Sequence, residues 1–309
     1  MAAPREATGR SSGKVILLGE HSVVHGHPAL AAGIGLGVDA KAEACPHGQS
    51  RLIVAPWGLD LAPTSEQPLG QAFAALLESY GREYGARIKL DVHLPGGAGL
   101  GCSAAMGVAA CVALDGLYEI ERSAEERADA ALVWERVFHG NPSGVDNAMS
   151  ACGGVAIFRR GEPLEHLQVA RPLPLVIAHS GESSSTKEVV AMVARQKDRD
   201  PKRVGQAFDA ITALVRNARL AVEAGDLKSV GQLMSMNQTL LSGLMLSTER
   251  IEDLCRAAES AESLGAKLTG AGAGGCVIAL GQDMDHARAI QKAMAPHASM
   301  SFTTQAGLR

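Results

Sequence analysis

Residues 95–105 read PGGAGLGCSAA, and this stretch decides which fold the chain is expected to adopt. Its four glycines, Gly96, Gly97, Gly99 and Gly101, follow a strand-like apolar run and precede an alanine-rich run typical of a helix. Such a loop lets backbone N–H groups point inward without side chains in the way, and the following helix adds the positive end of its dipole. The stretch therefore predicts a phosphate-binding loop, and an ordinary glycine-rich turn is the alternative.

Other signatures of phosphate binding or hydrolysis are missing or lack their context. GxxxxGK[ST] fails at Lys14, because Val15 stands where Ser or Thr is required. Gly270, Gly272 and Gly275 match GxGxxG, but a strand-like run follows them, whereas a dinucleotide site needs a helix there. GxSxG and HExxH do not occur. Phosphate chemistry through the 95–105 loop is the interpretation that remains.

A second cluster, residues 135–147, reads ERVFHGNPSGVDN and carries two carboxylates. A tight Gly/Asn/Pro turn separates Glu135 from Asp146, so both can reach one pocket. One carboxylate can hold Mg²⁺ and the other can accept a hydroxyl proton, as phosphoryl transfer requires. A solvated helix glutamate and an Asp that bonds its own turn are the alternatives. Ser103 at the predicted helix start is either an N-cap or a Mg²⁺ ligand.

Two further clusters lie near the ends of the chain. Residues 13–26 read GKVILLGEHSVVHG, where Lys14 is either a solvated edge lysine or a charge aimed at an anion. The histidines that follow Glu20 lack a firm helix, so they favour contact with a polar substrate over metal binding. Residues 267–276 read KLTGAGAGGC, which predicts either a tight hairpin or a close backbone approach to ligand phosphates.

The hydrophobic pattern predicts an α+β protein of two domains, residues 1–165 and 166–309. The predicted helices are 68–84, 103–118, 123–138, a short one after residue 142, 202–224, 227–241 and 249–264; the predicted strands are 15–18, 52–54, 88–94, 155–158, 175–178, 276–280 and 299–303. Ser123 and Glu126 form a capping box. Gly33, Gly35 and Gly37 are assigned to turns.

Composition narrows the function further. The 309 residues carry a net charge of −4 with no dense Lys/Arg cluster, so neither a nucleic-acid nor a membrane partner is expected. Six cysteines without CxxC spacing favour free thiols in a cytoplasmic protein. The 35 glycines exceed the usual share of about 7%, which fits glycine loops in a folded protein.

In this order, the four clusters resemble those of the GHMP kinase superfamily, and HGNPSGVDN narrows the resemblance to its mevalonate kinase family. The resemblance implies a two-domain GHMP kinase fold, with an N-terminal ribosomal protein S5 domain 2-like domain and a C-terminal ferredoxin-like domain. It further implies transfer of the γ-phosphoryl group of ATP to the C5 hydroxyl of mevalonate, with Mg²⁺ as cofactor. Mevalonate and ATP are thus the expected partners, and a homodimer is left open.

The site residues carry over from matching motif positions. The resemblance implies Asp146 as catalytic base with Lys14 beside it, and Ser103 and Glu135 as Mg²⁺ ligands. The implied ATP-binding residues are Pro95, Gly96, Gly97, Ala98, Gly99, Leu100, Gly101, Cys102, Ser103, Ala104 and Ala105. The implied mevalonate-binding residues are Lys14, Glu20, His21, Asp146, Thr186 and Gly272.

Two positions depart from the family pattern, and two classes of alternative remain. Cys102 replaces a serine, and Ala273 replaces a glycine that would matter only if φ is positive there. One alternative is another GHMP kinase, such as a mevalonate 3-kinase, a phosphomevalonate kinase, a diphosphomevalonate decarboxylase or a homoserine kinase. The other is an inactive ligand sensor, which would be expected to lose Lys14, Glu135 or Asp146.

Overall fold

The computed structural model describes residues 6–81, 85–140 and 142–307, which form two compact units. The first unit holds the chain up to Gly13 together with Leu36–Gly96 and Gly101–Gly153. The second holds Lys14–Gly35, Gly97–Leu100 and the chain from Gly154 onward. Strands β1 (Glu6–Leu18) and β2 (Ala29–Cys45) contribute residues to both units. The predicted division into residues 1–165 and 166–309 stays a prediction.

The sheet of the first unit orders its strands β4-β3-β5-β2. Its shorter strands are β3 (Arg51–Val54), β4 (Leu59–Leu61) and β5 (Gly85–Val92). β3 runs parallel to β5, and β2 runs antiparallel to β5. From Ala86 to Val92 buried and exposed residues alternate along β5, which is the pattern of a strand with one face in the core.

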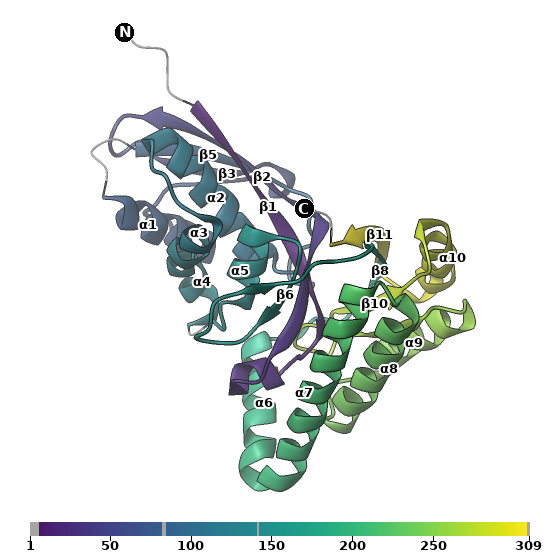
Figure 1. The fold of residues 1–309 in the computed structure, drawn as a ribbon. Coiled ribbons are helices and arrows are strands. Elements are labelled where there is room, and N and C mark those ends of the chain that lie inside the picture. The colour runs from purple at the N-terminus through teal and green to yellow at the C-terminus, as the bar shows by residue number, and fades with distance from the viewer. Residues whose placement is uncertain (1–5, 82–84, 141, 308–309) are drawn as a thin grey trace. The chain divides into compact units, whose positions relative to one another are not determined.

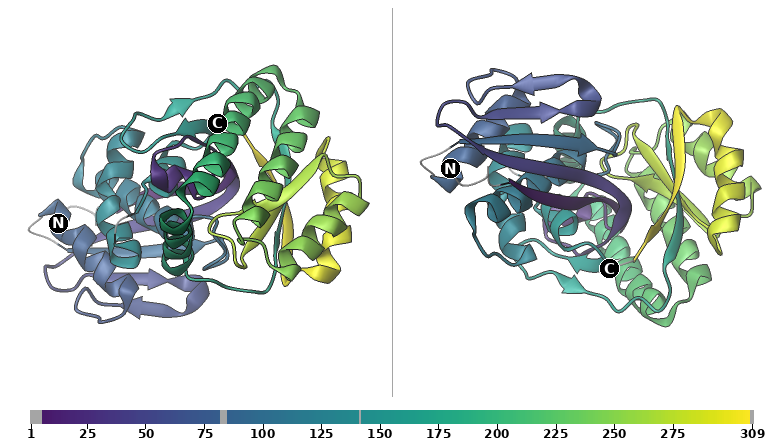
Figure 2. Two further views of the ribbon diagram at one scale, coloured as in Figure 1. Left: turned by 90° about the horizontal axis from the view of Figure 1, so that it is seen from below. Right: turned by 90° about the horizontal axis from the view of Figure 1, so that it is seen from above.

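Five α-helices cover one face of this sheet (Figures 1 and 2). They are α1 (Pro68–Tyr80), α2 (Cys102–Tyr118), α3 (Ala124–Ala130), α4 (Leu132–His139) and α5 (Val145–Cys152), and a short 3₁₀ turn, η2 (Ala55–Trp57), precedes β4. α2 is the central helix, because it packs against β5, α3, α4 and α5 and buries almost its whole surface. Its alanines and glycines allow this close packing: a Cβ on Gly107 would lie 2.8 Å from the Trp134 ring.

The second unit is built on the antiparallel strand order β11-β8-β10-β9. These strands are β8 (Leu173–His179), β9 (Gly265–Thr269), β10 (Cys276–Leu280) and β11 (Met300–Ala306). β11 also pairs with the first part of β2, which in turn pairs with β6 (Val155–Phe158), and β6 pairs with β7 (Glu165–His166). The order β11-β8-β10-β9 and the chain connections between these four strands are those of the expected ferredoxin-like domain.

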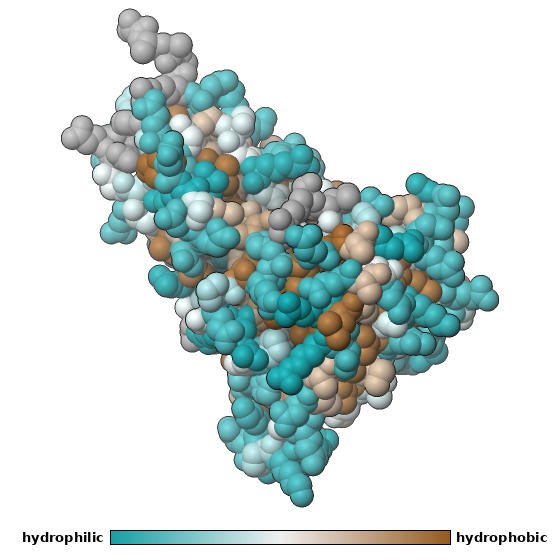
Figure 3. Space-filling view, viewed as in Figure 1, coloured by the Kyte–Doolittle hydropathy of each residue, from teal (hydrophilic) through white to brown (hydrophobic). Residues whose placement is uncertain are grey.

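The helices of the second unit are α6 (Thr186–Arg199), α7 (Pro201–Ala224), α8 (Leu227–Gly243), α9 (Glu249–Ser260) and α10 (Met284–Met294), with 3₁₀ turns η1 (Ser22–His25) and η3 (Ala295–His297). α8 packs on β9 at very short range, because a Cβ on Gly231 would lie 2.2 Å from the Leu264 carbonyl oxygen. Figure 3 shows a hydrophilic surface where α6 meets α7. Among the described residues no helix has the length and apolarity needed to span a membrane.

The predicted fold class is confirmed, and several predicted elements are wrong in detail. The predicted helix 123–138 is two helices, because the chain tightens at Ala131, whose carbonyl accepts from Trp134 three residues on. The part of the predicted helix 68–84 at residues 82–84 lies outside the described residues, and α1 ends at Tyr80 with Gly81 in the left-handed region. Gly33, Gly35 and Gly37 lie within β2 rather than in turns.

Candidate active site

The phosphate loop has the backbone geometry of an anion cradle. Gly97, Gly99 and Gly101 have φ values of 71°, 76° and 72°, which favour glycine over residues with a side chain. Residues in this alternating pattern turn successive N–H groups toward one side, where an anion can accept from them. A Cβ on Gly97 would meet no atom within 4 Å, so the space beside this glycine is open. The geometry therefore favours phosphate binding over an ordinary turn.

The helix behind the loop begins without a side-chain cap. Gly101 is the N-cap residue of α2, and no side chain there accepts from the first turn of this 17-residue helix. Ser103 is therefore not the N-cap. Its hydroxyl donates instead to Oε1 of Glu135 on α4, so the two predicted metal ligands are in contact. Glu135 is 1% exposed, which excludes a solvated helix glutamate.

This pair of oxygen ligands fits a hard divalent cation. A carboxylate and a hydroxyl are ligand types that Mg²⁺ accepts, alongside phosphate oxygens and water. Nε2 of His139, one helical turn beyond Glu135, lies 3.5 Å from the other oxygen of this carboxylate. Ser103 and Glu135 are thus the residues of the first unit that could hold a metal ion beside the start of α2.

Asp146 lies in the first turn of the eight-residue α5, behind Gly144 at φ 88°. Its side chain is half-buried, whereas the next residue, Asn147, is buried with no hydrogen-bond partner for its amide among the described residues. Lys14 belongs to the second unit and is 3% exposed, so it is not a solvated edge lysine. The expected pairing of Asp146 with Lys14 remains a prediction.

Within the second unit, the tip of the phosphate loop lies against the glycine loop 270–275. A Cβ on Gly99 would lie 3.4 Å from the Thr269 carbonyl oxygen and 3.8 Å from Cα of Gly270. The backbone N–H of Lys14 donates to the Leu100 carbonyl at 2.9 Å. Three clusters that are far apart in the sequence therefore meet. Where the two loops touch, the positive φ values of Gly99 (76°) and Gly270 (88°) favour glycine.

The glycine loop itself is a hairpin connection between β9 and β10 with a strained residue. Gly270, Gly272, Gly274 and Gly275 all have positive φ, and so does Ala273, at 53°. The Ala273 N–H donates to the Leu246 carbonyl at 2.7 Å, which fixes this conformation. The departure from glycine at 273 thus falls at a position where positive φ is needed.

The turn after β1 presents His21 in an unusual conformation. His21 has φ 60°, and its Nε2 donates to the Ala271 carbonyl at 2.7 Å. Burial lowers the pKa of His21, and the bond to Ala271 opposes that shift in part. The imidazole is therefore neutral at pH 7. His25 and His27 lie farther along and contact Phe208 of α7, so the histidines do not form one cluster of metal ligands.

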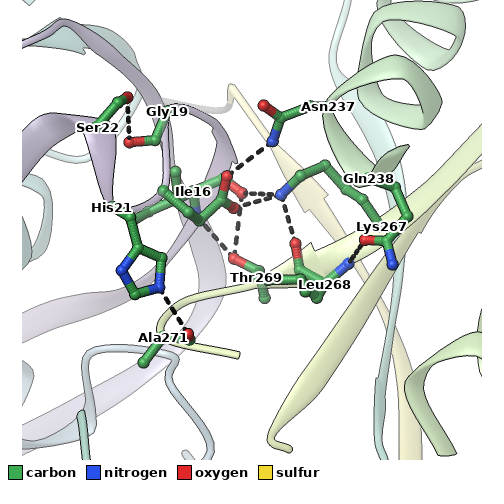
Figure 4. A network of polar contacts seen from close by, with 11 residues as sticks. Ile16, Gly19, His21, Ser22, Asn237, Gln238, Lys267, Leu268, Thr269 and Ala271 are labelled. Atoms are coloured by element: carbon green, nitrogen blue, oxygen red, sulfur yellow. Dashed lines mark hydrogen bonds and ion pairs between the residues drawn. The ribbon is translucent and has the colours of Figure 1, made fainter. Parts of the chain in front are cut away.

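Glu20 lies in a buried polar network, shown in Figure 4. Its carboxylate accepts from Lys267 of β9 and from Asn237 of α8. No role for Lys267 or Asn237 is predicted from the sequence. The available signal for Lys267 was its place between Ala266 and Leu268 in an otherwise apolar strand, whereas nothing in the sequence marks Asn237.

Thr186 is the first residue of α6 and is exposed. The hydroxyl of Ser184, two residues earlier, donates to the Gly272 carbonyl at 2.6 Å, so the 183–187 stretch is tied to the glycine loop. Cys102 is buried at the start of α2, with its thiol 3.9 Å from the Leu94 carbonyl. Burial raises the pKa of the Cys102 thiol to about 12, so it is uncharged at pH 7.

Comparisons with known proteins agree with this geometry. The family model of the GHMP kinases N terminal domain matches residues 68–154, and that of the GHMP kinases C terminal domain matches residues 210–298. The chain is 36% identical to a mevalonate kinase of Pyrococcus abyssi, with 93% of each protein covered. It is 34% identical to one of Aeropyrum pernix, with 97% of this chain and 95% of the relative covered.

Solved structures of GHMP kinases are also similar to this chain. The structure of L. major mevalonate kinase in complex with R-mevalonate superposes with a TM-score of 0.87 at 30% identity, covering 99% of this chain and 96% of the other. A Lactococcus lactis galactokinase shares the fold, with a TM-score of 0.79 at 19% identity, covering 98% of this chain and 94% of the other. The chain belongs to the GHMP kinases, within their mevalonate kinase family.

Proposed function

We propose that the protein transfers the γ-phosphoryl group of ATP to the C5 hydroxyl of mevalonate and yields 5-phosphomevalonate and ADP. The observation that carries the proposal is the contact between the two predicted metal ligands, Ser103 and Glu135, behind a loop with phosphate-binding geometry. The similarity to mevalonate kinases along nearly the whole chain selects the acceptor.

The loop supplies binding for the phosphates of ATP. Residues 95–105 would surround them with backbone N–H groups, and the uncapped start of α2 adds favourable dipole charge. Because phosphoryl transfer depends mainly on positioning and charge neutralisation, such a preorganised cradle is a large part of the catalytic apparatus. Cys102 leaves the backbone donors in place, so its departure from serine is compatible with this role.

Ser103 and Glu135 would hold Mg²⁺, which when bound neutralises charge on the phosphates of ATP. The site fits this ion because both side chains offer oxygen atoms and already lie in contact. Burial of Glu135 strengthens the attraction of its carboxylate for a cation, since water competes less there.

Asp146 and Lys14 would act on the reacting groups. Asp146 would orient the C5 hydroxyl and accept its proton, and Lys14 would stabilise the charge that develops on the transferred group. A carboxylate that serves a late proton transfer needs only to be ionised and well placed. Glu20, His21, Thr186 and Gly272 are proposed to shape the acceptor pocket.

A phosphorylation assay over several acceptors tests the proposal. The chain is incubated with Mg²⁺, ATP and either mevalonate, 5-phosphomevalonate, homoserine or galactose, and the position of the new phosphate is read by ³¹P NMR. We expect turnover with mevalonate and a 5-phosphate product. A 3-phosphate product would reject the proposed regiochemistry, turnover only with another acceptor would reject the substrate, and no turnover at all would favour an inactive sensor.

Three further expectations are part of this proposal. They are a cytoplasmic location, a lack of nucleic-acid or membrane partners, and domain bounds near residue 165. The oligomeric state is left open, and sedimentation of the full chain tests whether it is a homodimer. Limited proteolysis tests the domain boundary. If the boundary is correct, cleavage should occur first in the charged stretch between Arg159 and Leu173.

A further inference from the structure

The carboxylate of Glu20 is closed off from solvent. The side chain is 0% exposed, and both oxygens have partners: Oε1 accepts from Lys267 Nζ, and Oε2 accepts from Asn237 Nδ2 at 3.0 Å (Figure 4). A ligand could reach these oxygens only if the surrounding elements moved apart. Glu20 is thus placed to support its neighbours in the chain rather than to contact a substrate.

Lys267 is the centre of this network. Its ammonium is fully buried and donates to the Glu20 carboxylate, to the Leu268 carbonyl, and to the Ile16 carbonyl at 3.4 Å. All three ammonium hydrogens therefore have acceptors from the chain. Burial lowers the pKa of Lys267, and the charge of Glu20 opposes the shift. One side chain of β9 thereby links the last part of β1 to Glu20, two residues beyond the end of that strand.

Neighbouring contacts hold the end of β1 and the turn at His21 in place. Thr269 strengthens the junction of β9 with β1, since its hydroxyl accepts from the Ile16 N–H at 3.0 Å and donates to the Ile16 carbonyl at 3.1 Å. Glu20 is followed directly by His21, whose positive φ and bond to Ala271 depend on where this turn is held. The turn is therefore held before His21, at Ile16 and Glu20, and at His21 itself, by its bond to Ala271.

We propose that Lys267 is a positioning residue of the acceptor site: it holds the Glu20 carboxylate and so fixes the turn that presents His21. The inference rests on the proposed function, because the acceptor is taken to be mevalonate. Lys267 acts through Glu20, and it need not touch either substrate. Loss of the ion pair between Lys267 and Glu20 should therefore raise the KM for mevalonate more than the KM for ATP.

Steady-state kinetics of Lys267→Met, with mevalonate and ATP varied separately, tests this. We expect the KM for mevalonate to rise about tenfold or more, since small displacements of positioned groups cost this much. The KM for ATP should change by less than about twofold. Equal increases in both KM values, or none, would overturn the proposal.

A second variant covers the chance that Lys267→Met fails to fold, because it leaves the Glu20 charge buried without a partner. In the double variant Glu20→Gln/Lys267→Met both charges are gone, so stability should recover while the KM for mevalonate stays high. A normal KM for mevalonate in the stable double variant would show that the ion pair has no positioning role.

The matched control is Gln238→Met. Gln238 lies next to Asn237 on α8 and accepts from the Leu268 N–H of the same strand at 2.9 Å, yet it does not contact Glu20. We expect it to lower stability without a selective effect on mevalonate. A selective rise in the KM for mevalonate in this variant would show that general loosening of β9 is sufficient, and would overturn the proposal.

Hydrogen exchange separates this inference from the proposed function. The amides of Ser22, Val23 and Val24 are bonded within the turn, to Glu20, Gly19 and His21. In the double variant their exchange should be about tenfold faster or more, while amides of β10 keep their rates. Unchanged exchange in the turn would refute the positioning role, even if mevalonate proved not to be the acceptor. Failure of the wild-type chain to phosphorylate mevalonate would instead refute the proposed function alone.

Discussion

The hydroxyl of Ser103 in the first turn of α2 donates a hydrogen bond to the buried carboxylate of Glu135 on α4, 32 residues farther along the chain. The helices that carry these residues pack against each other within the first unit. A carboxylate that is almost fully removed from water is costly unless it is compensated, so its burial is a feature that calls for a role. The Mg²⁺ binding proposed for Ser103 and Glu135 would provide that role.

Glu135→Gln should therefore weaken the binding of Mg²⁺ at this site. The amide keeps the shape of the side chain but removes its charge, so we expect turnover at fixed ATP to fall about 100-fold and to need more free Mg²⁺. Initial rates measured against free Mg²⁺ test this.

The control for the metal prediction is Ser123→Ala, which removes a serine from the exposed capping box of α3. This change should cost about 1 kcal/mol of stability through the lost cap, with an unchanged Mg²⁺ response. If Glu135→Gln showed the same Mg²⁺ response as the wild type, Glu135 would not be a metal ligand.

Asp146→Asn should separate binding from chemistry. The amide cannot accept a proton at neutral pH, so kcat should fall by about 10³-fold, within the range typical of a lost general base. Binding of ATP, followed by displacement of a fluorescent nucleotide, should be unchanged. Asp129→Asn, an exposed carboxylate on α3, is the control and should leave kcat unaltered. Near-normal turnover in Asp146→Asn would remove this residue from the proposed role.

The strongest local signals in the sequence predicted elements correctly. The glycine-rich loop does open a helix, and the Ser123 and Glu126 capping box is formed in both directions. These features are local, because glycine conformation and capping involve residues within a few positions of one another. The ferredoxin-like unit was predicted through the family resemblance rather than through periodicity.

What the sequence did not predict depends on contacts between distant segments. β2 contains three glycines that weaken its strand pattern. At Gly37 glycine is needed because a neighbouring strand comes close: a Cβ there would lie 1.9 Å from the Ser11 carbonyl oxygen. The partnership of Lys267 with Glu20 joins residues 247 positions apart. Neither hydrophobic spacing nor local motifs carry information about such a pair, so only the fold reveals it.

Ala273→Gly should stabilise the protein. Ala273 has φ 53°, which costs an L-residue about 1 kcal/mol and costs glycine much less, although glycine gives back part of the gain through its freer unfolded chain. We expect a net gain of about 0.5 kcal/mol in the free energy of unfolding, measured by urea denaturation.

Gly272→Ala is the matched comparison one residue away. Gly272 has φ 77°, and a Cβ there would lie 2.6 Å from the Leu246 carbonyl oxygen, so both strain and collision oppose the change. This variant should lose well over about 1 kcal/mol. A loss of stability in Ala273→Gly would contradict the view that residue 273 is strained.

Buried thiols should make the protein sensitive to alkaline pH. Burial raises the pKa to about 12 for the thiols of Cys102, Cys111, Cys255 and Cys276. A thiol whose pKa is raised in the folded state contributes fully to stability below its pKa in the unfolded chain, which is near 9. That contribution to the free energy of unfolding is lost as the pH rises from about 9 toward 12. At pH 10 each such thiol should therefore lower the free energy of unfolding by about 1 kcal/mol relative to pH 7.5.

Cys102→Ser isolates one of these thiols and restores the serine of the family pattern. A serine hydroxyl does not ionise in this range, so the loss of stability between pH 7.5 and pH 10 should shrink by about 1 kcal/mol in this variant. Urea denaturation at the two pH values measures the difference. The phosphate loop keeps its backbone donors in the variant, so kcat should stay within about twofold of the wild type at pH 7.5. If the pH dependence of the free energy of unfolding were unchanged in this variant, ionisation of the Cys102 thiol in the unfolded chain would not be a cause of the loss of stability. A large fall in kcat would show that the cysteine is itself part of the ATP site.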